Sequence, residues 1–144
     1  MKLVKLAIAG IILAIIAQII HTVGAILSMS YYTDPANAHL WSKLMMPSAG
    51  PPPASFMYMS FLFGFIGMFL FSWVYSVIKK SVPGNSLISK GFTYGIIVTL
   101  IALVPGHLAM ILLLSLPVNL IIVWAGEGLA INLVNGVILG WINP

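Results

Sequence analysis

The sequence predicts an all-α integral membrane protein, folded as a bundle of four transmembrane helices. Of its 144 residues, 61% are hydrophobic and 6% are charged, and the mean hydropathy is +1.14. A soluble domain of this composition would expose too much apolar surface to water. Four apolar runs reach the length of about 20 residues that a helix needs to cross roughly 30 Å of hydrocarbon. None of them alternates polar with apolar residues as a barrel strand would, so helices are expected.

A single transmembrane domain is predicted over residues 1–144. The expected spans cover about residues 6–29, 56–78, 91–116 and 118–142. A turn cluster at Ser81–Asn85 and the short Leu116–Asn119 connection join neighbouring spans, which predicts two antiparallel helical hairpins. Residues 31–55 form the one long connection, an outer loop.

The distribution of lysine predicts the orientation in the membrane. The chain has six lysines and no arginine, and five of the six flank one end of the spans, whereas only Lys43 lies in the long loop. The positive-inside rule then places both the N and C termini in the cytoplasm. The lysines are scattered over span ends, which argues against nucleic acid as a partner. The absence of cysteine excludes disulfides and thiolate metal ligands.

The outer loop has two interpretations. Its Tyr31, Tyr32 and Trp41 are of the residue types that anchor chains at the headgroup level, and the Pro51–Pro53 run is stiff and extended. Anchoring is the interpretation we favour, and a binding loop for a partner is the alternative.

Small residues predict which helix faces pack together. In the first span they recur at a seven-residue spacing that includes His21, and they predict a close helix contact. That seam consists of Ala7, Gly10, Ala14, Ala17, His21, Gly24 and Ser28. In the second span, Ser60, Gly64 and Gly67 predict another close contact. Polar residues expected in the bundle interior are Gln18, one turn from His21, and Asn132 and Asn135 of the fourth span.

Three ionisable side chains are predicted to lie at one depth. His107 precedes Pro117 by ten residues and Glu127 follows it by ten, so each lies about 15 Å from that turn. His21 is eleven residues before Tyr32, which gives about 16 Å. Glu127 is the only glutamate of the chain, and a carboxylate at mid-membrane marks either a structural partner or a functional site.

Three roles are open for this layer. The first is a polar clamp that fixes helix register, worth about 0.6–2 kcal/mol for each hydrogen bond. The second is proton exchange between Glu127 and a histidine. The third is ligation: His21 and His107 as haem or cofactor ligands, or His21, His107 and Glu127 as ligands of a divalent metal. No catalytic residues are predicted, because the chain lacks the common nucleophile, phosphate-binding and zinc-protease motifs.

The stretch from Gly64 to Trp141 resembles a group of small four-span bacterial and archaeal membrane proteins of unknown function. The residues that carry the resemblance are Trp73-Val74-Tyr75, Pro83-Gly84, Pro105, Leu116-Pro117 and Trp124-Ala125-Gly126-Glu127-Gly128. The resemblance implies the four-span topology, a prokaryotic cytoplasmic membrane and a role for Glu127. It implies no activity.

The sequence favours a non-enzymatic structural or accessory subunit of a larger or homo-oligomeric membrane assembly. Four short spans enclose little volume, and small-residue seams suit contacts with other membrane subunits or with further copies in the lipid bilayer. The alternative is a small proton-coupled transport module, or a haem or metal redox module, that uses His21, His107 and Glu127.

Overall fold

A computed structural model describes residues 2–48 and 51–142, and in these ranges the chain is helical, with no β-strand. The long helices are α1 (Lys2–Leu27), α3 (Ala54–Ile78) and α6 (Val118–Ile142). A fourth long rod consists of α4 (Leu87–Val98), η2 (Thr99–Leu103) and α5 (Val104–Leu113). Short α2 (Met29–Thr33) and η1 (Pro35–Leu40) lie in the long connection between α1 and α3, which we call the outer segment after its predicted side of the membrane. All four long segments are long and apolar enough to cross a membrane, which confirms the predicted class.

The third span is shifted toward the N-terminus relative to the prediction. It runs over Leu87–Leu113 instead of 91–116. The Ser86 hydroxyl caps its first turn by accepting a hydrogen bond from the Ser89 amide at 3.1 Å, so the helix begins before the apolar run does. At its other end the chain becomes extended at Leu114, ahead of Pro117.

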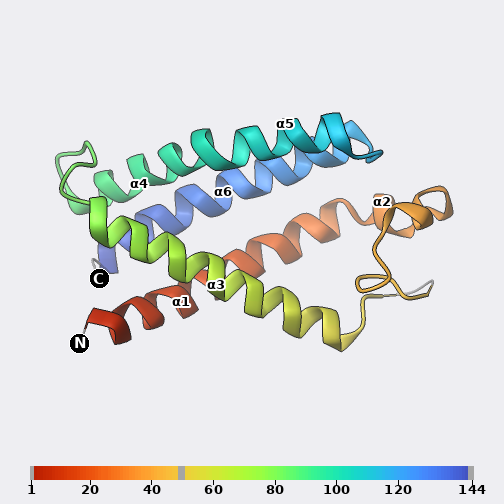
Figure 1. Cartoon of the computed structure of the whole chain (residues 1–144), viewed down its shortest axis with the longest axis horizontal. Coiled ribbons are helices and arrows are strands. Elements are labelled where there is room, and N and C mark those ends of the chain that lie inside the picture. The colour runs from red at the N-terminus through yellow and green to blue at the C-terminus, as the bar shows by residue number, and fades with distance from the viewer. Residues whose placement is uncertain (1, 49–50, 143–144) are drawn as a thin grey trace.

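Helices α4 and α6 lie side by side along their length (Figure 1). Glycines make this approach close: the space that a Cβ would need at Gly91 is taken by the carbonyl of Gly136, and the reverse holds at Gly136. A Cβ at Gly95 would likewise overlap the backbone of Asn132, and a Cβ at Gly140 would overlap the backbone of Leu87. Close backbone contact of this kind maximises dispersion between helices that have no hydrophobic force to join them in lipid.

Helix α1 crosses α3 and also contacts α6 (Figure 1). The crossing is close at Gly10, where a Cβ would lie 3.1 Å from the Cα of Phe69. The predicted close contact at Gly64 and Gly67 is wrong, because nothing lies within 4 Å of a Cβ built at either glycine. Two straight helices that cross approach closely at one point only, and Gly64 and Gly67 lie beyond that point on the outer-loop side.

The best-packed part of the bundle lies toward the two termini. Its buried cluster joins all four long segments and includes Leu13, Tyr75, Tyr94 and Leu139. The Tyr94 hydroxyl donates to the carbonyl of Phe71 at 2.9 Å and thereby joins α4 to α3. Because packing is concentrated here, the opposite end of the α1–α3 pair is left open.

The rod α4–η2–α5 changes its helix type ahead of Pro105. Residues Thr99–Leu103 form a π-helix, in which the amide of Val104 donates to the carbonyl of Thr99. Proline has no amide hydrogen, and a π-turn is one way to accommodate this without breaking the rod. The rod therefore passes Pro105 through one wider turn and continues as α5.

An aromatic cluster attaches the outer segment to α6. Tyr32 and Trp41 have ring centroids 4.9 Å apart, and Trp41 and Trp124 have centroids 6.5 Å apart. The indole nitrogen of Trp124 also donates to the hydroxyl of Tyr32 at 2.9 Å. Two of the three predicted interfacial residues, Tyr32 and Trp41, therefore contact the bundle itself.

Candidate functional site

The site is centred on a hydrogen-bonded pair that joins α1 to α6. Nδ1 of His21 and Oε2 of Glu127 are 3.0 Å apart, and when the carboxyl group is ionised Nδ1–H donates to it. The Glu127 side chain is 9% exposed, whereas that of His21 is 58% exposed. The carboxylate is thus enclosed by the bundle and the imidazole stands at its edge. A carboxylate that accepts from Nδ1 fixes the tautomer of a neutral imidazole and leaves Nε2 as a hydrogen-bond acceptor.

Gly24 makes room for the carboxylate. A Cβ at this position would overlap Oε1 and Cδ of Glu127, so the acid lies directly against the backbone of α1. Oε1 is buried and has no hydrogen-bond partner in the structure. One oxygen of the acid therefore binds His21, and the other is held in apolar surroundings, where an unpartnered polar atom is costly.

His107 makes its hydrogen bond within its own helical rod. Its Nδ1–H donates to the carbonyl of Leu103 at 2.8 Å, one turn earlier in the rod. Of the two histidines predicted to lie at the depth of Glu127, His21 makes the hydrogen bond with it.

The two asparagines of α6 each bond to a different neighbour. Nδ2 of Asn132 donates to the hydroxyl of Thr99 at 3.1 Å, which ties α6 to the π-turn. Nδ2 of Asn135 donates to the carbonyl of Leu13 at 3.2 Å, which ties α6 to α1. Both asparagines are buried, and each bond crosses between helices.

A cavity of about 190 Å³ lies beside the His21–Glu127 pair, between α1, α3 and α6. His21 and Gln18 line it from α1, and Ser60, Gly64 and Met68 line it from α3. It exists because α1 and α3 separate beyond their crossing at Gly10. The polar side chains of this wall come from both helices, so the cavity is not purely apolar.

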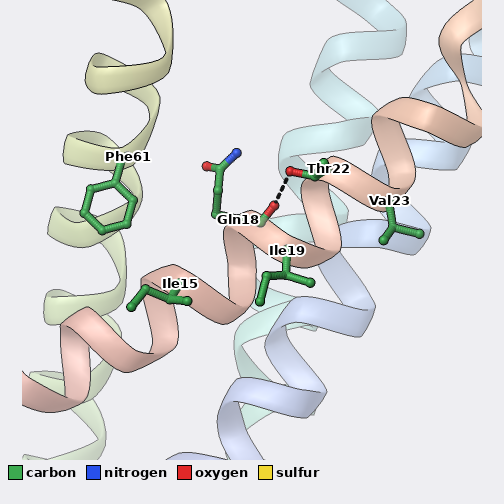
Figure 2. A pocket seen from close by; sticks show the side chains of 6 residues that line it. All are labelled: Ile15, Gln18, Ile19, Thr22, Val23 and Phe61. Atoms are coloured by element: carbon green, nitrogen blue, oxygen red, sulfur yellow. Dashed lines mark hydrogen bonds between the residues drawn. The ribbon is translucent and has the colours of Figure 1, made fainter. Parts of the chain in front are cut away.

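A second hollow, of about 320 Å³, lies on the outward side of the same opening (Figure 2). Apart from Gln18 and Thr22 its lining is apolar, with Ile15, Ile19 and Val23 from α1 and Phe61 from α3. We call this hollow the outer groove. Gln18 and Phe61 line both the outer groove and the cavity, so they lie between the two.

Metal or haem ligation stays a prediction. Across residues 2–48 and 51–142, no three side chains of histidine, cysteine, aspartate or glutamate are grouped as ligands of one ion. His21 and His107 do share one property of ligating histidines: each donates Nδ1–H to an oxygen of the protein, which leaves Nε2 to bind another atom.

Sequence reasoning missed most of the cavity wall on α3. Nothing in the spacing of Met68 and Phe61 marks them as cavity residues. Ser60 and Gly64 carry a usable signal, since a polar and a small residue four apart lie on one helix face. Their pattern predicts a helix contact, whereas they line a cavity.

The fold and this site define a multi-pass helical membrane protein with a buried carboxylate–histidine pair beside a small cavity. Comparisons with protein-family models, with curated proteins and with solved structures find no match for the chain.

Proposed function

We propose that this protein is an accessory subunit of a membrane assembly, with a transmembrane helix of a partner subunit packed in the outer groove. In this proposal both termini lie in the cytoplasm, as the lysine distribution predicts, and the membrane is the cytoplasmic membrane of a prokaryote. The observation that carries the proposal is the side chain of Gln18. It stands out from α1 into the hollow that Phe61 also lines (Figure 2), and within the described ranges no hydrogen bond reaches its amide.

An amide in the hydrocarbon region needs a hydrogen-bond partner that lipid tails cannot supply. Water is scarce at this depth, the surrounding Ile15, Ile19 and Val23 offer no polar group, and the Thr22 hydroxyl already donates to the backbone carbonyl of Gln18. A helix of another subunit supplies both the polar partner for Gln18 and the apolar surface for the three aliphatic side chains. Their spacing of four residues presents one continuous face of α1 to such a helix.

The test combines particle mass with site-specific photo-cross-linking. A photoreactive phenylalanine analogue at Ile19, in the groove, should give one discrete larger adduct in native membranes. The same analogue at Leu112, which is 83% exposed on another face, is the control and should give none. Gln18→Leu should reduce the yield at position 19. A monomeric particle in mild detergent, together with no discrete adduct at position 19, would overturn the proposal.

A second candidate function is proton transfer in a transport module. The observation that favours it is the 3.0 Å hydrogen bond between His21 and Glu127 at the edge of a cavity, because such a pair can exchange a proton. Proton uptake by liposomes that contain the protein tests it. Uptake that is lost in Glu127→Gln supports it, and uptake equal to that of empty liposomes removes it.

A further inference from the structure

We infer that the cavity beside His21 binds the ring of a lipid-soluble phenol or hydroquinol, whose hydroxyl donates a hydrogen bond to Nε2 of His21. This inference goes beyond the accessory role and does not depend on a partner subunit. It rests on three properties of the cavity: the acceptor that it presents, its volume and its wall.

The acceptor follows from the His21–Glu127 hydrogen bond. When the His21 ring is neutral and Glu127 accepts from Nδ1–H, the other ring nitrogen, Nε2, carries a lone pair. His21 lines the cavity, and 58% of its side-chain surface is exposed. Glu127 thus acts as a positioning residue that fixes the orientation and tautomer of the ring. An acceptor in an apolar medium binds a ligand hydroxyl in preference to a ligand that offers only carbon.

The volume of the cavity limits the ligand to a single ring. An engineered protein cavity of about 150 Å³ binds benzene, and this cavity measures about 190 Å³. One six-membered ring with a hydroxyl and a small substituent fits it, and a macrocycle such as haem does not. The ligand must also partition into the bilayer, because the cavity lies between helices that are long and apolar enough to cross a membrane.

The wall suits an aromatic ring. Phe61 and the thioether of Met68 lie on the α3 side, and both make favourable contacts with ring faces and edges. Ala14 and Ala17 line the cavity from α1, and their small side chains leave room for a ring. Gln18 and Phe61 border both the cavity and the outer groove, so the cavity is closed on that side by an aromatic ring and an amide.

The glycines of α3 supply a matched pair of variants. Gly64 lines the cavity and Gly67 does not, and a Cβ at either position meets nothing within 4 Å. Gly64→Leu fills the cavity without a clash against the backbone. Gly67→Leu makes the same chemical change on the same helix and leaves the cavity open.

The experiment is a titration of the purified full-length protein in micelles with 4-fluorophenol, followed by fluorine NMR. Empty micelles give the non-saturable background. We expect saturable binding to the wild type and to Gly67→Leu, and binding at least about tenfold weaker to Gly64→Leu and to His21→Phe. The second probe, 4-fluorotoluene, replaces the hydroxyl by a methyl group of similar size and should bind the wild type about tenfold more weakly.

Each other outcome overturns the inference. Equal affinity of the two probes would mean that the hydroxyl is not recognised. Equal binding to Gly64→Leu and Gly67→Leu would mean that the ring lies outside this cavity. Absence of any saturable component in the folded wild type would mean that the cavity does not bind phenols. None of these results affects the cross-linking at position 19, so the accessory role is tested separately.

Discussion

Gly91 and Gly136 each present their Cα to the backbone carbonyl of the other, so α4 and α6 touch backbone to backbone at this point. The contact is reciprocal, and no side chain intervenes to adjust. Gly95 and Gly140 extend the same seam by one turn in each direction. The seam sets the distance between α4 and α6. It also fixes the position of α6 along α4, and therefore the level at which Glu127 lies.

Gly136→Ala should separate α4 from α6 and lower the free energy of unfolding by about 1–3 kcal/mol, because a Cβ there meets backbone that cannot move aside. Reversible unfolding in mixed micelles measures the change. Gly67→Ala is the control: it adds the same methyl group where nothing lies within 4 Å, and should be neutral or slightly stabilising. Equal losses in the two variants would show that the seam is not tightly packed.

His21→Leu should lower the free energy of unfolding by about 1–3 kcal/mol, because it leaves both oxygens of a buried acid without a donor. In the double variant His21→Leu/Glu127→Leu most of the lost free energy of unfolding should be recovered. The double-mutant cycle should give a coupling of about 1–2 kcal/mol. His107→Leu serves as the comparison, since its bond is to the Leu103 carbonyl; a coupling of His107 with Glu127 as large as that of His21 would contradict the structure.

The spans were predictable from the sequence, because the apolar length of a helix is a local property, and the fourth span is correct at both ends. The depth of His21 and Glu127 was also predictable, since depth depends only on the rise per residue. Which histidine contacts Glu127 was not predictable, because the rise per residue gives the height of a side chain along the helix axis but not the direction in which it points. Direction depends on helix phase, and the π-turn over Thr99–Leu103 changes the phase of α5 ahead of His107 in a way that no 3.6-residue pattern reveals.

The opening between α1 and α3 could not be predicted from the sequence either. Ser60, Gly64 and Gly67 have the pattern of a close helix contact, and small residues do permit one. Whether they make it depends on where the two helices cross. That position is decided at Gly10 and Phe69 and by the buried cluster around Tyr75 and Tyr94, which are long-range contacts.

Gly24→Ala should displace the carboxylate of Glu127 and weaken its bond to His21, while the helices stay in place. The reason is that the added Cβ meets the flexible end of a side chain and not backbone. Nitrogen NMR of the His21 ring measures the effect: the wild type should show predominantly the Nδ1–H tautomer, and the variant a mixture of both. Gly126→Ala, where a Cβ meets nothing within 4 Å, is the control and should leave the ring signals unchanged. Identical spectra for Gly24→Ala and the wild type would mean that the carboxylate is held elsewhere.

Trp124→Phe should loosen the outer segment from the bundle. The substitution keeps an aromatic ring next to Trp41 but removes the indole N–H that donates to the Tyr32 hydroxyl. A hydrogen bond of this kind contributes about 0.5–1.5 kcal/mol, so local opening should become about two- to tenfold more frequent.

Hydrogen exchange of the Met45 and Met46 amides, which donate to the Ser42 carbonyl, reports this opening in the outer segment. Tyr32→Phe removes the same hydrogen bond from its other side and should accelerate exchange by a similar factor, with little further effect when both substitutions are combined. Trp73→Phe, at a side chain that is 50% exposed on α3, is the matched control and should leave exchange at Met45 and Met46 unchanged. Additive effects of Trp124→Phe and Tyr32→Phe would show that the two residues stabilise the segment through separate contacts, because a shared hydrogen bond can be lost only once.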